Sequence, residues 1–120
     1  MATRTFQARG TGYYPDSSAL EGGFNDRHDK PLRTLQAFLG GEAEYVSVAM
    51  DKNLQIPYGT KLRIPEIEAA HGNKPIEFRV VDTGGAFTDK GYTRIDICTA
   101  DKKASEDAAI NRILTLEFSE

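Results

Sequence analysis

The feature that most constrains the fold is a series of six short segments in which apolar and polar residues alternate. They are residues 4–14, 45–50, 60–64, 76–81, 93–98 and 113–118. A period of two is typical of a strand with one face in a core and the other in solvent. Because these strands are short and regularly spaced, they predict a mainly β protein closed into a small barrel, which has no exposed sheet edges.

One or two short helices are expected between these strands. Pro31 opens the first, where its missing N–H costs nothing, and apolar residues recur at helical spacing from Leu32 until Gly40 ends it. A second is predicted around Ser105 to Arg112. Residues 65–75 are a loop or a short helix, and residues 16–30 are a long loop rich in Asp, Ser, Gly and Asn.

Length and composition narrow the class of protein. A chain of 120 residues with no repeat or linker is expected to form a single domain, residues 1–120. No apolar run is long enough for a membrane span. The net charge of −3 and the scattered cations argue against nucleic acid as a partner. No signal peptide is recognised at the start, so a cytosolic protein, a mature chain without its leader, or an exported phage or effector protein is expected.

The densest chemical signal is the segment Val80–Phe87. Asp82 follows directly after an apolar strand, and Gly84 and Gly85 follow it closely. A strand end holds a side chain on a rigid element, and glycines let a ligand approach the backbone. The alternative is an aspartate that only caps its own turn.

A second signal is an aspartate inside the strand 93–98. Ile95 and Ile97 point one way, so Arg94, Asp96 and Cys98 share the other face. Aspartate is disfavoured in strands, so its presence needs a reason. One reason is an ion pair or simple exposure; the other is a carboxyl group in a partly apolar cleft, suited to acid catalysis.

Taken together and in order, these segments resemble the three-aspartate (3D) domain, found in membrane-bound lytic transglycosylases of the A type and in small spore and stationary-phase proteins. The similarity spans residues 11 to about 100 and lies in Thr11–Pro15, Asp51, Ile56–Lys61, Asp82–Ala86 and Arg94–Ile97. The resemblance implies a six-stranded double-psi β-barrel.

The same resemblance implies peptidoglycan cleavage without a cofactor. Asp96 would protonate the glycosidic oxygen between N-acetylmuramic acid and N-acetylglucosamine and then accept the O6 proton as a 1,6-anhydro ring forms. Asp82 would act nearby as a second negative charge. Asp51 would shape the site or hold its loops, with Lys61 as a candidate partner. The expected partner is the glycan strand, bound by a monomer at the cell wall, in the periplasm or outside the cell.

Further residues are expected to contact the glycan. They are Tyr13, Tyr14, Thr83, Gly84, Gly85 and Lys61. The two tyrosines offer flat surfaces for sugar rings, although core tyrosines are the alternative. His28 and His71 lack a third ligand at metal spacing, so no metal site is expected, and Cys98 is interpreted as a small core or groove residue.

Two alternatives remain open. Val80–Gly84 also resembles the active-site turn of retroviral-type aspartic proteases, but the late strand 112–118 lacks the glycine of their second element. Barwin- and expansin-like proteins use the same barrel to bind polysaccharide without cleaving it. The stretch from Ala86 to Tyr92 is longer than in the usual 3D pattern, which would reshape the rim of the groove.

Overall fold

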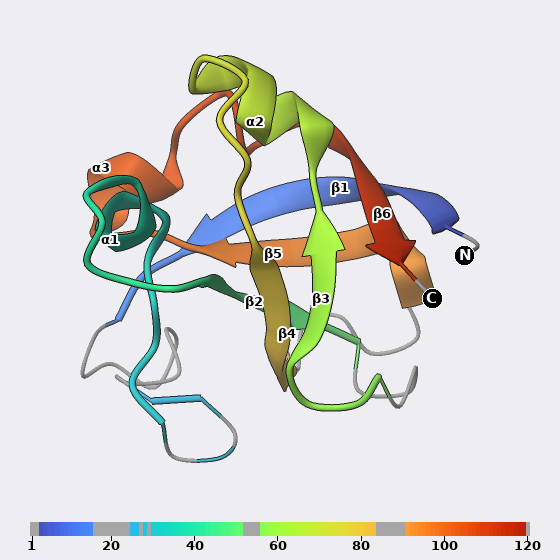
Figure 1. Ribbon diagram of the computed structural model, residues 1–120, viewed down its shortest axis with the longest axis horizontal. Helices are drawn as coiled ribbons and strands as arrows, with labels where there is room; N and C mark the ends of the chain where they lie inside the picture. The colour runs from blue at the N-terminus through green and yellow to red at the C-terminus, as the bar shows by residue number, and fades with distance from the viewer. Residues whose placement is uncertain are drawn as a thin grey trace.

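The computed structural model describes residues 3–15, 25–26, 28, 30–51, 56–83 and 91–119. Its six strands form a closed barrel in the order β1-β5-β2-β4-β3-β6 (Figure 1). The strands are β1 (Thr3–Tyr13), β2 (Val46–Met50), β3 (Thr60–Arg63), β4 (Phe78–Thr83), β5 (Arg94–Cys98) and β6 (Ile113–Ser119). The predicted small six-stranded barrel is confirmed, and each strand lies within about two residues of its expected position.

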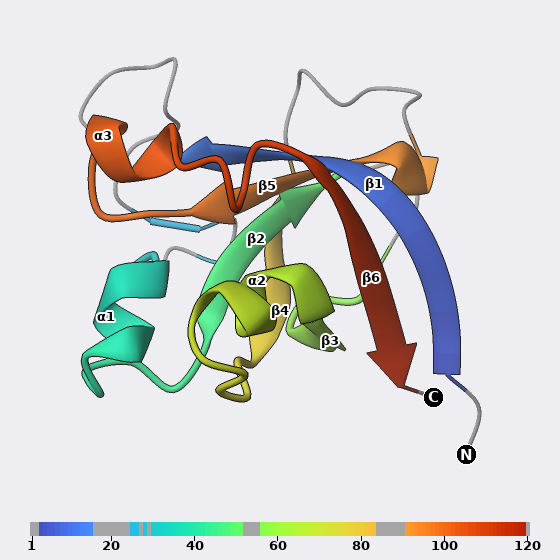
Figure 2. The same ribbon diagram turned by 90° about the horizontal axis from the view of Figure 1, so that it is seen from above.

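Most strands that are neighbours in the barrel are not consecutive in the sequence, so the connections between them cross. β1 pairs with β5 in parallel and β2 pairs with β4 in parallel, while β2 and β5 are antiparallel neighbours. β6 pairs antiparallel with both β1 and β3 and so closes the barrel. The two chain ends therefore lie close together at the edge formed by β1 and β6, as Figures 1 and 2 show.

In the part of the chain that the structure describes, three short helices and one 3-10 turn accompany the barrel. They are α1 (Leu35–Leu39), α2 (Pro65–Ala70), α3 (Lys102–Ser105) and η3 (Gly91–Thr93). α1 and α3 lie at the same end of the molecule, away from the termini (Figures 1 and 2). Among the helices that the structure describes, none is long and apolar enough to cross a bilayer.

The core fills the barrel from all six strands. Val48 on β2 lies opposite Val80 on β4 and Ile97 on β5, and all three are at most 1% exposed. Residues that alternate with these in sequence point outward. This alternation places Thr11 of β1, Asp96 of β5 and Asp82 of β4 on the outer face, with the buried Ala49 of β2 between the two aspartates.

Two glycines in β1 allow other segments to pack closely on that strand. A Cβ at Gly10 would lie 2.3 Å from the carbonyl oxygen of Ile110, and one at Gly12 would lie 2.5 Å from that of Ser105. Real Cβ atoms do not approach that closely, so β1 needs glycine at both positions to receive α3 and the segment after it.

Two helix positions differ from the prediction. The helix expected around Ser105 to Arg112 is wrong: α3 begins after Asp101, whose side chain caps Ala104 N–H, and ends at Ser105. Asn111 Nδ2 donates to the carbonyl oxygens of Ser105 and Asp107, and Asp107 Oδ1 accepts from Ala109 N–H. These side-chain bonds compete with helical backbone bonds and fold residues 106–112 into turns.

The first helix begins later than Pro31. Thr34 is its N-cap, and its Oγ1 accepts from Ala37 N–H at 3.0 Å. Pro31 instead forms an antiparallel bridge with Asn25, and Leu32 is buried separately against the outside of the barrel. The helical spacing of Leu32 thus reflects burial rather than helix.

Candidate functional site

The register of the barrel places Asp82 and Asp96 on either side of one small residue. Ala49 on β2 lies opposite Asp82 on β4 and opposite Asp96 on β5. On the far side of β5, Thr11 of β1 lies opposite Asp96. Directly opposed residues point to the same face, so Thr11, Asp96, Ala49 and Asp82 form one outward row. Two strand spacings put the Cα atoms of the aspartates roughly 10 Å apart.

A β-bulge brings Asp82 into this row. Val48 pairs with Val80, but the next residue, Ala49, pairs with Asp82, so Val81 is the extra residue. Strict alternation from Val80 would have pointed Asp82 into the core, and the bulge turns it to the outer face. Bulges occur often beside active sites, where they re-aim a side chain.

Thr11 holds the carboxyl group of Asp96. Its Oγ1 donates to Asp96 Oδ1 at 2.8 Å, across the parallel β1–β5 pair. Both side chains are half-buried. A hydroxyl donor to a carboxylate is a charge-assisted hydrogen bond and fixes the orientation of the carboxyl group as well as stabilising its charge.

Tyr13 and Cys98 form a buried, proton-bearing pair beside the row. They belong to one apolar cluster with Leu32 and Ala49, and Tyr13 is 7% exposed. Burial raises the pKa of Tyr13 well above its ordinary value; the neighbouring Cys98 and the negative charges of Asp82 and Asp96 raise it further. Burial likewise raises the pKa of Cys98 to about 12, so the thiol is not a nucleophile at neutral pH. The Tyr13 ring is packed in this cluster, which fits the core alternative rather than a surface for a sugar ring.

Asp51 anchors the loop that precedes β5. It is 3% exposed, and its Oδ2 accepts from the backbone N–H of Gly91 at 2.8 Å. Gly91 has a φ of 59°, a left-handed conformation that favours glycine. Asp51 therefore ties the end of β2 to the 3-10 turn that leads to Asp96, whereas Lys61, the expected candidate partner, lies against Glu77.

Asp26 is a second buried carboxylate, in addition to Asp51, and it was not recognised in the sequence. Asp26 is 7% exposed; its Oδ1 accepts from the backbone N–H groups of His28 and Lys30, and Tyr58 O–H donates to its Oδ2. The His28 ring stacks on Tyr58 with centroids 3.7 Å apart. The cluster ties the segment before α1 to the loop before β3. The segment Asn25–Lys30 looks like an ordinary charged loop, and only the fold brings Tyr58 to it.

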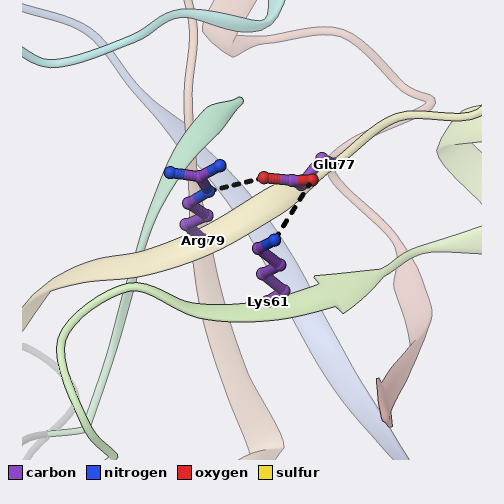
Figure 3. Close-up of polar contacts among 3 residues, drawn as sticks. All are labelled: Lys61, Glu77 and Arg79. Carbon is purple, nitrogen blue, oxygen red and sulfur yellow. Dashed lines mark hydrogen bonds and ion pairs between the residues drawn. The ribbon is translucent and has the colours of Figure 1, made fainter. Parts of the chain in front are cut away.

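The other predicted contact residues lie in different places. Tyr14 follows β1 and is half-buried, and Thr83 is the last residue of β4. Gly84 and Gly85 lie outside the described residues. Lys61 is on β3, where its Nζ is 4.0 Å from Glu77 Oε1, and Arg79 Nε donates to Glu77 at 2.5 Å (Figure 3).

A groove of about 650 Å³ lies beside Lys61. Its lining comes from β3, the residues before β4, and Phe38 of α1, and it contains none of the three aspartates. Its walls are apolar at Phe38, Leu62 and Ile76, with paired charges at the rim. This groove and the carboxylate row are therefore separate features.

Within the described part of the chain, no group of three or more His, Cys, Asp or Glu side chains is placed to hold a metal ion.

A scan against protein-family models found no match to this chain, and a search of curated proteins found no similar sequence. The fold and the carboxylate row are thus the observations on which a function is argued.

Proposed function

We propose that this protein is a peptidoglycan lytic transglycosylase with Asp96 as its general acid and base. The observation that carries the proposal is the row in which Asp96 and Asp82 flank Ala49 on the outside of a closed barrel, with Asp96 held by Thr11. Because the side chain of Ala49 is only a methyl group, it projects less than the carboxyl side chains on either side of it. Ala49 itself is only 5% exposed and packs with Tyr13 and Leu32, so a sugar would meet the half-buried carboxyl groups on either side of it.

The chemistry assigned to Asp96 needs one group that first gives and then takes a proton. Protonated Asp96 would donate to the glycosidic oxygen as the bond to C1 of N-acetylmuramic acid breaks. The resulting carboxylate would accept the proton of the O6 hydroxyl as O6 bonds to C1, which leaves a 1,6-anhydro ring and restores the acid. Because Asp96 Oδ1 accepts from Thr11, the catalytic proton would be carried by Oδ2.

Asp82 supplies a second negative charge at a distance. A nearby carboxylate disfavours ionisation of Asp96 and stabilises positive charge developing on the sugar. Retaining glycosidases place their two carboxyl groups about 5 Å apart so that one attacks C1. Cα atoms roughly 10 Å apart suit the wider carboxyl spacing of inverting glycosidases, about 6.5–9.5 Å, as well. Attack by the substrate's own O6 is therefore proposed from the resemblance to the 3D domain.

The proposal assigns the glycan strand as substrate and the cell wall as the place of action. Binding without cleavage, as in barwin- and expansin-like proteins, is the alternative function on the same barrel. The buried supports of the row favour the enzyme, because a binding surface alone needs no carboxyl group fixed by Thr11.

Mass spectrometry of purified peptidoglycan incubated with the protein tests the proposal, with Asp96→Asn beside it. Anhydro-muropeptides from the wild type and none from the variant are the expected result. Products with reducing ends would replace the transglycosylase with a hydrolase. Glycan that sediments with the protein but stays uncut would favour the binding alternative, and neither binding nor cleavage would overturn both.

A further inference from the structure

The imidazole ring of His28 takes no part in the hydrogen bonds that tie its loop to the barrel. Asp26 Oδ1 accepts from the backbone N–H of His28 at 2.8 Å, and the Tyr58 hydroxyl donates to Asp26 Oδ2. His28 thus contributes to the tie through a backbone N–H, which every residue except proline has. A histidine side chain at this position needs a different explanation.

The imidazole ring is nevertheless held in one orientation. Its centroid lies 3.7 Å from that of the Tyr58 ring, and the two planes differ by 4°. The Tyr58 ring is fixed in turn, because its hydroxyl donates to Asp26, which is 7% exposed. His28 itself is exposed. One face of its ring therefore rests on Tyr58, and the remainder is presented to solvent on a rigid support.

The loop that carries His28 is fastened beside the carboxylate row at two points. The first is Leu32, which follows this loop in the sequence. Leu32 is buried in the same cluster as Ala49, the residue that lies opposite both Asp82 and Asp96. The C-terminal end of the loop therefore lies on the outside of β2, at the centre of the row.

The second point lies on the other side of β4. Gly59, the neighbour of Tyr58, donates its N–H to the carbonyl oxygen of Val80 at 2.8 Å, and Asp82 follows on the same strand. β4 lies between β2 and β3 in the barrel order. In Figure 1 the loop of His28 (cyan) and the start of β3 (light green) lie at the lower end, where β4 also ends. The stacked rings are therefore placed beyond the Asp82 end of the row.

A flat ring on a fixed support at this place fits the face of a sugar ring. One face of a pyranose consists of C–H groups, which pack against the negative face of an aromatic ring. A ring that is ordered before the ligand arrives also binds at a low cost in conformational entropy. The stacked pair of Phe6 and Tyr92 differs, because both rings pack against Phe118 and the core.

We infer that the His28 ring, supported by Tyr58, is a sugar-binding subsite that takes one pyranose ring of a peptidoglycan glycan strand. The identity of the glycan rests on the proposed function, whereas the aromatic support does not. The bound sugar would lie beyond Asp82 as seen from Asp96, so it belongs to the strand that flanks the bond to be cut. His28 would position this strand and is not a catalytic residue.

Proton NMR of the imidazole rings tests the subsite, because the chain has two histidines and His71→Ala identifies their signals. The probe is a peptide-free glycan strand of alternating N-acetylglucosamine and N-acetylmuramic acid, added to Asp96→Asn so that it stays uncut. The His28 signals should shift and show nuclear Overhauser contacts to C–H protons of a sugar ring, while the His71 signals stay in place. Strands that leave the His28 signals unmoved, whether or not they bind elsewhere, would overturn the inference.

Affinity for the same strands provides a second test, with every variant made in Asp96→Asn. His28→Ala should weaken binding about two- to tenfold, as expected for the loss of one aromatic contact, and His28→Phe should restore it with another flat ring. His71→Ala is the matched control: it removes the imidazole at the end of α2 and should leave the affinity unchanged. Unchanged affinity in folded His28→Ala, or a loss that His28→Phe does not restore, would contradict the subsite.

The subsite and the activity can fail separately. Wild-type protein that cuts peptidoglycan while the His28 signals ignore the strands would overturn the subsite and leave the transglycosylase. Strands that contact His28 but are never cut by the wild type would remove the proposed function and support the sugar-binding subsite.

Discussion

The two sides of the barrel satisfy their carboxylates in different ways. On the outer face of β1, β5 and β2, hydroxyl and backbone N–H groups hold them: Thr11 for Asp96, and Gly91 for Asp51. On the side of β3 and the start of β4, cations hold Glu77 and Glu68, although Glu66 of α2 accepts from the N–H and hydroxyl groups of Thr115. There Lys61 and Arg79 flank Glu77, and Arg63 binds Glu68.

This difference indicates where chemistry can occur. Exposed ion pairs such as Lys61 with Glu77, where the lysine side chain is 66% exposed, contribute little and remain screened by water. The pKa of a carboxyl group that is held by a neutral hydroxyl still responds to burial and to nearby charges. The groove lies on the side of the ion pairs. Concavity alone would therefore point to a different side of this barrel from the proposed site.

The largest expected effect is that of Asp96→Asn on turnover. Removing a general acid and base typically costs a factor of about a hundred to ten thousand, so anhydro-muropeptide formation should fall by at least a hundredfold. Glu77→Gln makes the same carboxylate-to-amide change on the other side and should keep turnover within about twofold. Equal losses in both variants would erase the distinction between the two sides.

Gly12→Ala should destabilise the barrel by about 1–3 kcal/mol, because its Cβ would lie 2.5–2.6 Å from backbone atoms of Ser105. Thermal unfolding measures the loss. Gly72→Ala is the comparison: it has a positive φ of 75° but open space around a Cβ, so it should cost only about 1 kcal/mol of backbone strain. A Gly12→Ala variant as stable as the wild type would show that α3 does not pack on β1 as described.

Two threonine-to-valine changes, one on each side of the barrel, should affect different properties: kcat at the carboxylate row and stability on the other side. Thr11→Val removes the donor to Asp96 and should lower kcat about tenfold, as expected for one hydrogen bond to a charged group. Thr115→Val removes the donor to Glu66 on the other side and should lower stability without changing kcat. Turnover and melting temperature of the pair provide the test, and the reverse pattern would contradict it.

The smallest expected effect is a pH-dependent loss of stability in Glu66→Gln. Burial raises the pKa of Glu66, but hydrogen bonds from the N–H and hydroxyl groups of Thr115 and the charge of Arg112 outweigh it, so the pKa lies below the ordinary 4.5. A lowered folded pKa stabilises the fold fully above about pH 4.5 and is lost as the pH falls through the folded value. Glu66→Gln should cost about 1 kcal/mol at pH 7, allowing for solvent screening, and less below pH 4.5. Urea unfolding at pH 7 and pH 3.5 would show this convergence; a difference that grows in acid would reverse the sign.

The barrel could be predicted from the sequence because the alternation of apolar and polar residues that marks each strand is a local pattern. All six strands were located, and the aspartate in β5 was assigned to the face opposite Ile95 and Ile97, as the structure shows. The meeting of Asp82 and Asp96 across Ala49 could not be read from spacing, because it depends on the parallel β2–β4 pair, the antiparallel β2–β5 pair and the bulge at Val81.

The errors also have physical causes. The turns after α3 arise from side-chain bonds of Asp107 and Asn111 that a search for apolar spacing does not register. The burial of Tyr13 depends on Leu32, far away in sequence, so a residue expected at a sugar-binding surface lies inside a cluster. The Asp26 and Tyr58 pair likewise requires two loops that only the folded barrel brings together.

The most direct test of the central claim is to map where peptidoglycan fragments bind. Soluble disaccharide-peptide fragments can be titrated into isotope-labelled Asp96→Asn, which should bind without cleaving, while amide signals are followed. The account predicts that Thr11, Ala49, Asp82 and their neighbours on β5 respond, while Leu62 and Glu77 do not. Responses confined to the groove beside Lys61 would contradict it and move the site to the other side of the barrel.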